Sequence, residues 1–65
     1  MFKVKDVVAP LWGIMRPSEP IGLSVDTRCE VVEVRKRDKR VCVKREDGRG
    51  GLFWLDFDAI RKWGG

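Results

Sequence analysis

The residues best suited to chemistry form a basic cluster in the middle of the chain. Seven of the fourteen lysines and arginines lie in the stretch RKRDKRVCVKR, which runs from Arg35 to Arg45. Basic side chains at this density can hold phosphates by charge and by hydrogen bonds. Three tryptophans are also present, and an exposed indole ring can stack on a base. The alternative is that the cluster is only the solvated end of a hairpin, where basic residues discourage edge-to-edge pairing.

Catalytic and metal-binding patterns are not visible. The chain has no histidine, so His-dependent catalytic arrangements and the usual His/Cys zinc sites cannot form. Its 65 residues make one small domain, spanning residues 1–65, that is too short to enclose a deep active site. Asp56 and Asp58 lie two apart, but their surroundings suggest only a turn. We therefore expect a binding protein without enzyme activity, metal or cofactor.

The overall charge favours anionic partners. The formal net charge is +4 and the sequence pI is about 9.5. No apolar run approaches the roughly 18 residues of a membrane span. The first residues, MFKVKDVV, mix lysine and aspartate too early for a secretory signal. These features predict a cytoplasmic location without a membrane partner.

The elements that must position the basic cluster are strands. Apolar alternation or β-branched residues indicate strand in the ranges 2–8, 21–27, 29–35, 40–45 and 51–57. Three prolines, Pro10, Pro17 and Pro20, mark a long loop, and Gly48, Gly50 and Gly51 mark a turn. The best candidate for a helical turn is DFDAIRKW, residues 56–63. This pattern predicts an all-β domain, either a small barrel or a sandwich.

A hairpin with Asp38 and Lys39 at its tip would carry the cluster. In that register Val34 faces Val43 and Glu33 faces Lys44, which are favourable cross-strand pairs. The side chains predicted to point inward are Val32, Val34, Val41 and Val43. Those predicted to point outward are Arg35, Arg37, Arg40 and Lys44, with Arg37 facing Arg40.

The same register separates the two cysteines. Cys42 would face Arg35, six residues from Cys29 along the strand, which is roughly 20 Å. A disulfide needs Cα atoms within about 7 Å. We therefore predict two free thiols, neither of them a nucleophile.

The segment DGRGGLFWLDF, residues 47–57, resembles the strand of Src-homology-3 domains that runs Gly-Arg-x-Gly-Leu-Phe-Pro-x-Asn-Tyr. The direct matches are Gly48, Arg49, Gly51, Leu52 and Phe53, and Asp56 and Phe57 stand at the Asn and Tyr positions. Upstream, GLSV at 22–25 resembles the Leu-Ser-Phe that ends the family's first long loop. The order of segments agrees along nearly the whole chain. The resemblance implies a five-stranded Src-homology-3-like barrel with a long first loop and one short helical turn near the C-terminus.

The chain departs from that family where the family binds proline-rich peptides. It has no tyrosine, carries VCV in place of the tandem tryptophan, and has Trp54 in place of the proline. The hairpin beside the groove is basic instead of acidic. The resemblance therefore implies an anionic ligand along Trp12, Trp54 and Phe57.

Side-chain parity along the last long strand separates core from surface. Phe53 and Leu55 are predicted to be buried, with Val34 and Val43, and Trp54 then points outward. Trp12 lies on the long loop with Ile14 and Met15, either folded back as a plug or exposed as an apolar patch.

Two functions remain open. The first is sequence-tolerant binding of DNA or RNA, for which the candidate residues are Arg35, Lys36, Arg37, Lys39, Arg40, Lys44 and Trp54. The alternative is a protein-interaction module for an acidic peptide or partner-protein surface, for which they are Trp12, Ile14, Met15, Trp54 and Phe57. A sulfur carrier of the ubiquitin-like kind would use the final Gly64-Gly65, but it needs a helix between Ile21 and Val34, where the sequence alternates as strand.

Overall fold

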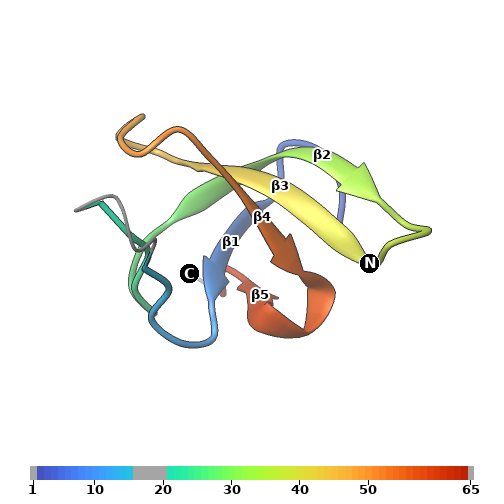
Figure 1. The fold of residues 1–65 in the computed structure, drawn as a ribbon, viewed down its shortest axis with the longest axis horizontal. Coiled ribbons are helices and arrows are strands. Elements are labelled where there is room, and N and C mark those ends of the chain that lie inside the picture. Colours follow the sequence, from blue (N-terminus) through green and yellow to red (C-terminus); the bar gives the residue numbers. More distant parts are fainter. Residues whose placement is uncertain (1, 16–20, 65) are drawn as a thin grey trace.

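The computed structural model describes residues 2–15 and 21–64, and these form an all-β domain (Figure 1). Five strands and one 3-10 turn follow one another in the chain. They are β1 (Val7–Pro10), β2 (Cys29–Arg35), β3 (Arg40–Arg45), β4 (Leu52–Asp56), η1 (Phe57–Ala59) and β5 (Ile60–Lys62). The all-β class, the five strands and the short helical turn near the C-terminus are confirmed. Pro17 and Pro20 lie outside the described residues.

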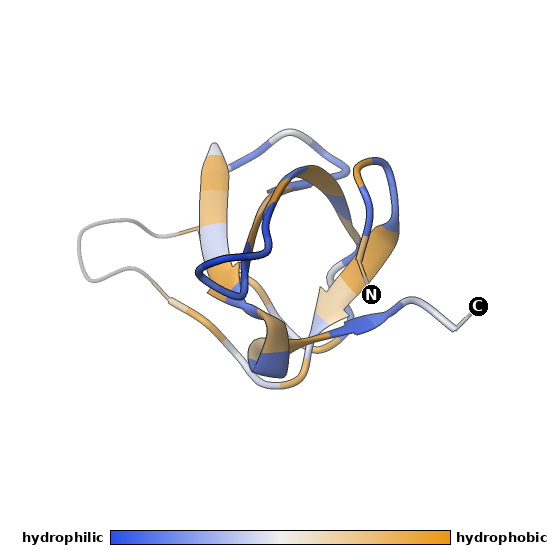
Figure 2. Ribbon diagram, turned by 90° about the vertical axis from the view of Figure 1, so that its right-hand side faces the viewer, coloured by the Kyte–Doolittle hydropathy of each residue, from blue (hydrophilic) through white to orange (hydrophobic). Residues whose placement is uncertain are grey.

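The strands form one antiparallel sheet in the order β4-β3-β2-β1-β5. Seen end-on in Figure 2, the sheet curls around a common interior. β4 alternates as its sequence predicts: Phe53 and Leu55 are buried, and Trp54 is exposed. The main core cluster consists of Val8, Leu23, Cys29, Val31, Val41, Val43, Phe53, Leu55 and Ile60.

The predicted hairpin register was wrong by two residues. Val34 pairs with Val41, and the last pair before the turn is Arg35 with Arg40, so Arg37 does not face Arg40. The turn contains four residues, Lys36 to Lys39, closed by a hydrogen bond from the Lys39 N–H to the Lys36 carbonyl at 3.2 Å. Lys39 has a left-handed φ of 54°. A shift of two residues keeps every side chain on its face, so the four side chains predicted to point outward are exposed.

A β-bulge in β2 overturns the predicted faces nearer the start of that strand. The register shifts between Val31 and Glu33, which leaves Val32 as the extra residue. Val31 is therefore fully buried opposite Val43, whereas Val32 is only half-buried. Glu33 faces Cys42 and not Lys44. Lys44 faces Glu30 instead, with 3.4 Å between the charged atoms.

Two of the predicted strand regions are mostly irregular. In the range 2–8 only Val7 and Val8 belong to a strand, Val4 is exposed, and Lys5 has a positive φ of 77°. The range 21–27 contributes a single bridge, between Leu23 and Ile14. Alternation of apolar and polar residues gives a strand only where a neighbouring strand can pair with it by backbone hydrogen bonds. No helix occurs between Ile21 and Val34, which argues against the carrier.

The burial of the two cysteines and of Val34 can now be compared with the predictions. Cys29 and Cys42 are free, as predicted, and both are buried. Cys42 faces Glu33 and Trp54 rather than Arg35. Val34 is half-buried against the core rather than fully buried. The described residues contain no helix of the length and apolarity that crossing a membrane requires.

Candidate nucleic-acid interface

The outer face of strands β2, β3 and β4 carries the most prominent exposed ring of the sheet. Trp54 is on β4 opposite Cys42, which in turn faces Glu33 on β2. Because Phe53 and Leu55 point into the core, the Trp54 side chain stands on the solvent side and remains 42% exposed. This ring is supported by regular backbone on a paired strand, so its position is well defined.

Arg35 lies over the Trp54 ring. Its guanidinium carbon is 4.4 Å from the ring centroid, which is the distance of a stacked cation–π pair. The Arg35 Nε also donates to Glu33 Oε2 at 2.9 Å, and this hydrogen bond raises the pKa of Arg35 above its ordinary value. Arg35 is thus a fixed positive charge on an exposed aromatic platform.

The basic cluster divides into paired and unpaired residues. Four of its seven cations face carboxylates, in the pairs Arg35–Glu33, Arg40–Asp56, Lys44–Glu30 and Arg45–Asp47. The other three, Lys36, Arg37 and Lys39, form no ion pair with any residue that the structure describes. All three lie in the exposed turn between β2 and β3. The unpaired charge of the basic cluster is therefore concentrated at this turn.

An acidic hollow lies on one flank of the turn. Its volume is about 450 Å³, and it is lined by Asp38, Lys39, Asp56, Phe57 and Asp58. These carboxylates are not arranged to hold a metal ion. No group of three or more Cys, Asp or Glu side chains among the described residues is placed to do so. Three carboxylates and one cation line this flank, so an anionic chain is favoured to leave the turn along the Trp54 face.

Phe57 belongs to the packing beside the turn. Its ring lies 5.6 Å from that of Phe2, and its N–H donates to the Lys39 carbonyl at 2.8 Å. It is half-buried, so it offers less of its ring to a ligand than Trp54 does. The predicted row of Trp12, Trp54 and Phe57 is not joined by ring contacts in the described part of the chain.

Three apolar side chains of the loop after β1 are exposed. Trp12 is 54% and Met15 65% exposed, and Leu11 is exposed beside them. Ile14 differs, because its backbone bridges to Leu23 and its side chain packs on the core. In Figure 1 this loop lies at the lower left and the turn between β2 and β3 at the right. The structure therefore presents the two candidate surfaces at different ends of the molecule.

Neither thiol is suited to nucleophilic chemistry. Burial raises the pKa of Cys29 to about 11 and also raises the pKa of Cys42. Thiols in these settings stay protonated near neutral pH. Cys42 instead lies directly across from Trp54 on the neighbouring strand.

Sequence reasoning missed a second aromatic centre at Trp63. The guanidinium carbons of Arg61 and Arg28 lie 5.5 and 5.8 Å from its ring centroid. The signal was present in the run Arg61-Lys62-Trp63, where two cations adjoin a tryptophan. Arg28, however, comes from the other half of the chain and is brought there only by the sheet.

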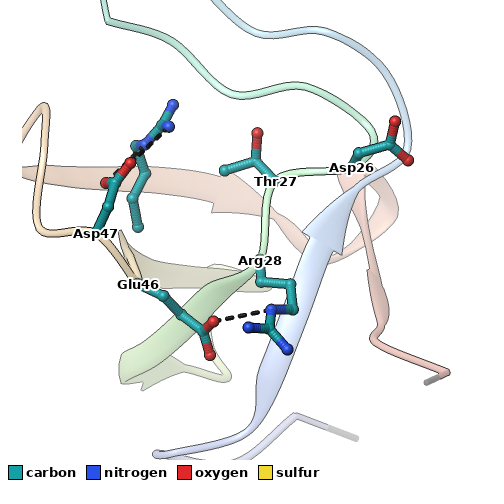
Figure 3. A pocket seen from close by; sticks show the side chains of 6 residues that line it. Asp26, Thr27, Arg28, Glu46 and Asp47 are labelled. Carbon is teal, nitrogen blue, oxygen red and sulfur yellow. Dashed lines mark hydrogen bonds and ion pairs between the residues drawn. The ribbon is translucent and has the colours of Figure 1, made fainter.

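Hydrogen bonds from Arg45, at the end of β3, join Asp47 to Gly22 in the connection between β1 and β2. We call this arrangement the clasp. Arg45 donates twice to Asp47, at 3.0 and 2.8 Å, and once to the Gly22 carbonyl at 2.6 Å. Figure 3 shows Asp47 in this arrangement beside the Arg28–Glu46 ion pair, whose atoms are 2.9 Å apart. Arg45 is therefore occupied with structure and is not counted among the binding residues.

Comparison with known proteins gives no match: no protein-family model, no curated protein and no solved structure is significantly similar to this chain.

Proposed function

We propose that this protein binds single-stranded nucleic acid with little sequence preference. A base stacks on the Arg35–Trp54 pair, and Lys36, Arg37 and Lys39 hold the adjoining phosphates. The observation that carries the proposal is the guanidinium of Arg35, 4.4 Å over the exposed Trp54 ring. Arg35 ends the strand β2, and the turn that follows holds three cations without an ion pair among the described residues. No step is catalytic.

The energetics favour a single strand over a duplex. Base–aromatic stacking contributes about 1–3 kcal/mol per base, and every base offers a face for it. In a duplex, neighbouring base pairs already cover those faces. The Arg40–Asp56 and Lys44–Glu30 pairs are exposed and contribute little net stability, so a phosphate can replace the carboxylate. Arg40 and Lys44 then act as additional phosphate contacts.

The fold belongs to the same proposal. We infer a Src-homology-3-like barrel, supported by five antiparallel strands, a long connection between β1 and β2, and a 3-10 turn directly before the last strand. The peptide groove of that family would have been replaced by an anion-binding face. A cytoplasmic location fits two thiols that are free.

The test is a fluorescence-anisotropy titration of labelled dT12 and a 12-base-pair duplex at 50 mM salt. We expect tighter binding to dT12, and a loss of about 5- to 150-fold in the Trp54→Ala variant, from the stacking contribution. Trp12→Ala removes an equally large exposed ring at the other end of the molecule and serves as the control. Equal affinities of the parent and Trp54→Ala for dT12 would contradict the proposal.

A second candidate function rests on the loop after β1. Adjacent exposed Leu11 and Trp12, with Met15, form an apolar patch of the kind that marks contact with another protein. A photo-crosslinking amino acid at position 12 should then give one discrete adduct in cell extract that resists nuclease and is lost with Met15→Ser. Adducts only at position 54, removed by nuclease, would favour the nucleic-acid function.

A further inference from the structure

Trp63 has the surroundings of a second stacking site. Its backbone N–H donates to the Val7 carbonyl at 2.9 Å. This hydrogen bond continues the pairing of β5 with β1 and holds the residue in place. Arg61 and Arg28 lie 5.5 and 5.8 Å from the ring centroid, farther than the 4.4 Å of Arg35 over Trp54. Both guanidiniums are still within cation–π range of the ring, and Trp63 itself is half-buried.

The two arginines beside Trp63 retain donors for an anion. The Arg61 side chain donates to the Val25 carbonyl at 3.3 Å and has no carboxylate partner among the described residues. Arg28 directs its Nε to Glu46. A guanidinium has five N–H donors, so both keep several for phosphate oxygens.

The sheet register places Trp63 and Trp54 on the same outer face. Trp63 is level with Val7, which pairs with Glu30, and Glu30 pairs with Lys44. Trp54 pairs with Cys42, two residues from Lys44 along β3. Positions two apart on a strand share a face, and this face is opposite to the buried Val43.

The separation of the two rings suits a short single strand. They lie on opposite edges of the sheet, four strand spacings apart, and each spacing is about 4.8 Å. Measured along the backbone of the sheet this is roughly 20 Å, and the path over its convex outer surface is longer, so at least six nucleotides at about 3.4 Å each are needed to span it. Single domains that bind one strand commonly cover about 4–16 nucleotides.

The surface between the rings does not repel a phosphate chain outright. Its carboxylates are each paired with a cation, in the pairs Glu33–Arg35, Glu30–Lys44 and Glu46–Arg28. A hollow of about 310 Å³ lies on this path, lined by Val7, Glu30, Lys44 and Glu46.

We propose that Trp63, with Arg61 and Arg28, is a second stacking subsite for the same single strand. This rests on the proposed function, because it extends the site at Trp54 across the sheet. A strand of four nucleotides reaches one ring only, whereas a strand of about ten reaches both. Linking two contacts in one ligand raises affinity beyond either contact alone.

The test compares dT4 with dT10 on the parent, Trp63→Ala and Arg61→Ala. The parent should bind dT10 at least 10-fold more tightly than dT4. Trp63→Ala should bind dT4 within about twofold of the parent and lose roughly 5- to 150-fold on dT10. Arg61→Ala should show the same pattern with a smaller loss of affinity for dT10. Because Arg61 is exposed, this variant should fold even if Trp63→Ala does not, and the proposal can then still be tested.

The outcomes separate the two proposals. If the folded Trp63→Ala and Arg61→Ala variants bind dT10 as the parent does, or lose dT4 and dT10 equally, the second subsite is overturned while binding at Trp54 stands. If the parent binds neither length, the proposed function fails and the second subsite with it.

Discussion

Arg35 combines two roles that lysine cannot share. Its planar guanidinium lies over Trp54 while its Nε donates to Glu33, so the cation is held against an aromatic surface. A base can lie on that plane as it would on a ring, and the charge meets the phosphate that follows. The ammonium of lysine is a compact point charge without a flat face.

Arg35→Lys should therefore lower affinity for dT12 several-fold while leaving the dependence on salt unchanged, because the charge is kept. Arg37→Lys is the matched control, since Arg37 makes no ring contact in the described part of the chain. Anisotropy titrations at three salt concentrations measure both quantities. Equal affinities of the two variants would show that Arg35 acts only through its charge.

At the scale of elements, the turn between β2 and β3 is expected to supply most of the electrostatic attraction. Binding of a single strand weakens with salt by a log–log slope of about −0.7 for each phosphate neutralised. Replacing Lys36 and Arg37 with Gln, and Lys39 with Asn, should flatten the slope by about two units. Asn is chosen at position 39 because it tolerates the positive φ found there.

The control for the turn is Arg49→Gln, which removes one exposed charge from the opposite end of β3. Its slope should match that of the parent. A triple variant that folds, by circular dichroism, and keeps the parent's slope would show that the turn is only a solvated hairpin end.

The clasp between β3 and the long loop predicts an acid-sensitive contribution to stability. The hydrogen bonds from Arg45, and then the backbone N–H of Arg49, lower the pKa of Asp47 to about 2 from an ordinary value near 3.8. A carboxyl whose pKa is lower in the folded state stabilises the fold fully above the unfolded pKa. That stabilisation is lost as the pH falls from about 4 toward 2.

Melting temperatures of the parent and Asp47→Asn measure this effect. The parent should be the more stable protein above pH 5, and the difference should shrink below pH 4 and vanish near pH 2. Other carboxyls titrate in both proteins, so only the difference reports on Asp47. A difference that stays constant from pH 6 to 2 would rule out a titrating clasp.

The strands were predictable where the residue types leave one choice. β-Branched runs gave β2 and β3 their bounds, and parity gave Phe53, Trp54 and Leu55 their faces. The bulge was not predictable, because Val31 and Val32 are the same residue and either fills the core. The turn KRDK contains no Gly or Asn-Gly to specify its length, so the predicted register was wrong by two residues.

For the same reason the sequence did not reveal which cations of the candidate site are paired with carboxylates. Which cations are neutralised depends on cross-strand partners such as Asp56 for Arg40 and Glu30 for Lys44, and these follow only from the register. A basic stretch in the sequence therefore overstated the free charge. Trp63 was missed because Arg28 reaches it through the sheet and not through the chain.

At the scale of the whole molecule, binding and folding are coupled. The domain has a small core made largely of valine, so its total stability is expected to be modest. A ligand that binds only the folded state adds RT ln(1 + [L]/Kd) to that stability, about 2.7 kcal/mol at 100 times Kd. In a domain of this size each 1 kcal/mol shifts the melting temperature by roughly 4–8 °C.

Saturating dT12 at 100 times Kd should therefore raise the melting temperature by about 10–20 °C in low salt. An abasic strand of the same length carries the phosphates without the rings, so at the same concentration it should give a clearly smaller shift that 200 mM salt abolishes. Differential scanning calorimetry measures both. Equal shifts from the two ligands would mean that the protein recognises charge alone and that Trp54 and Trp63 take no part, whereas no shift from either would direct attention to Trp12 and a protein partner.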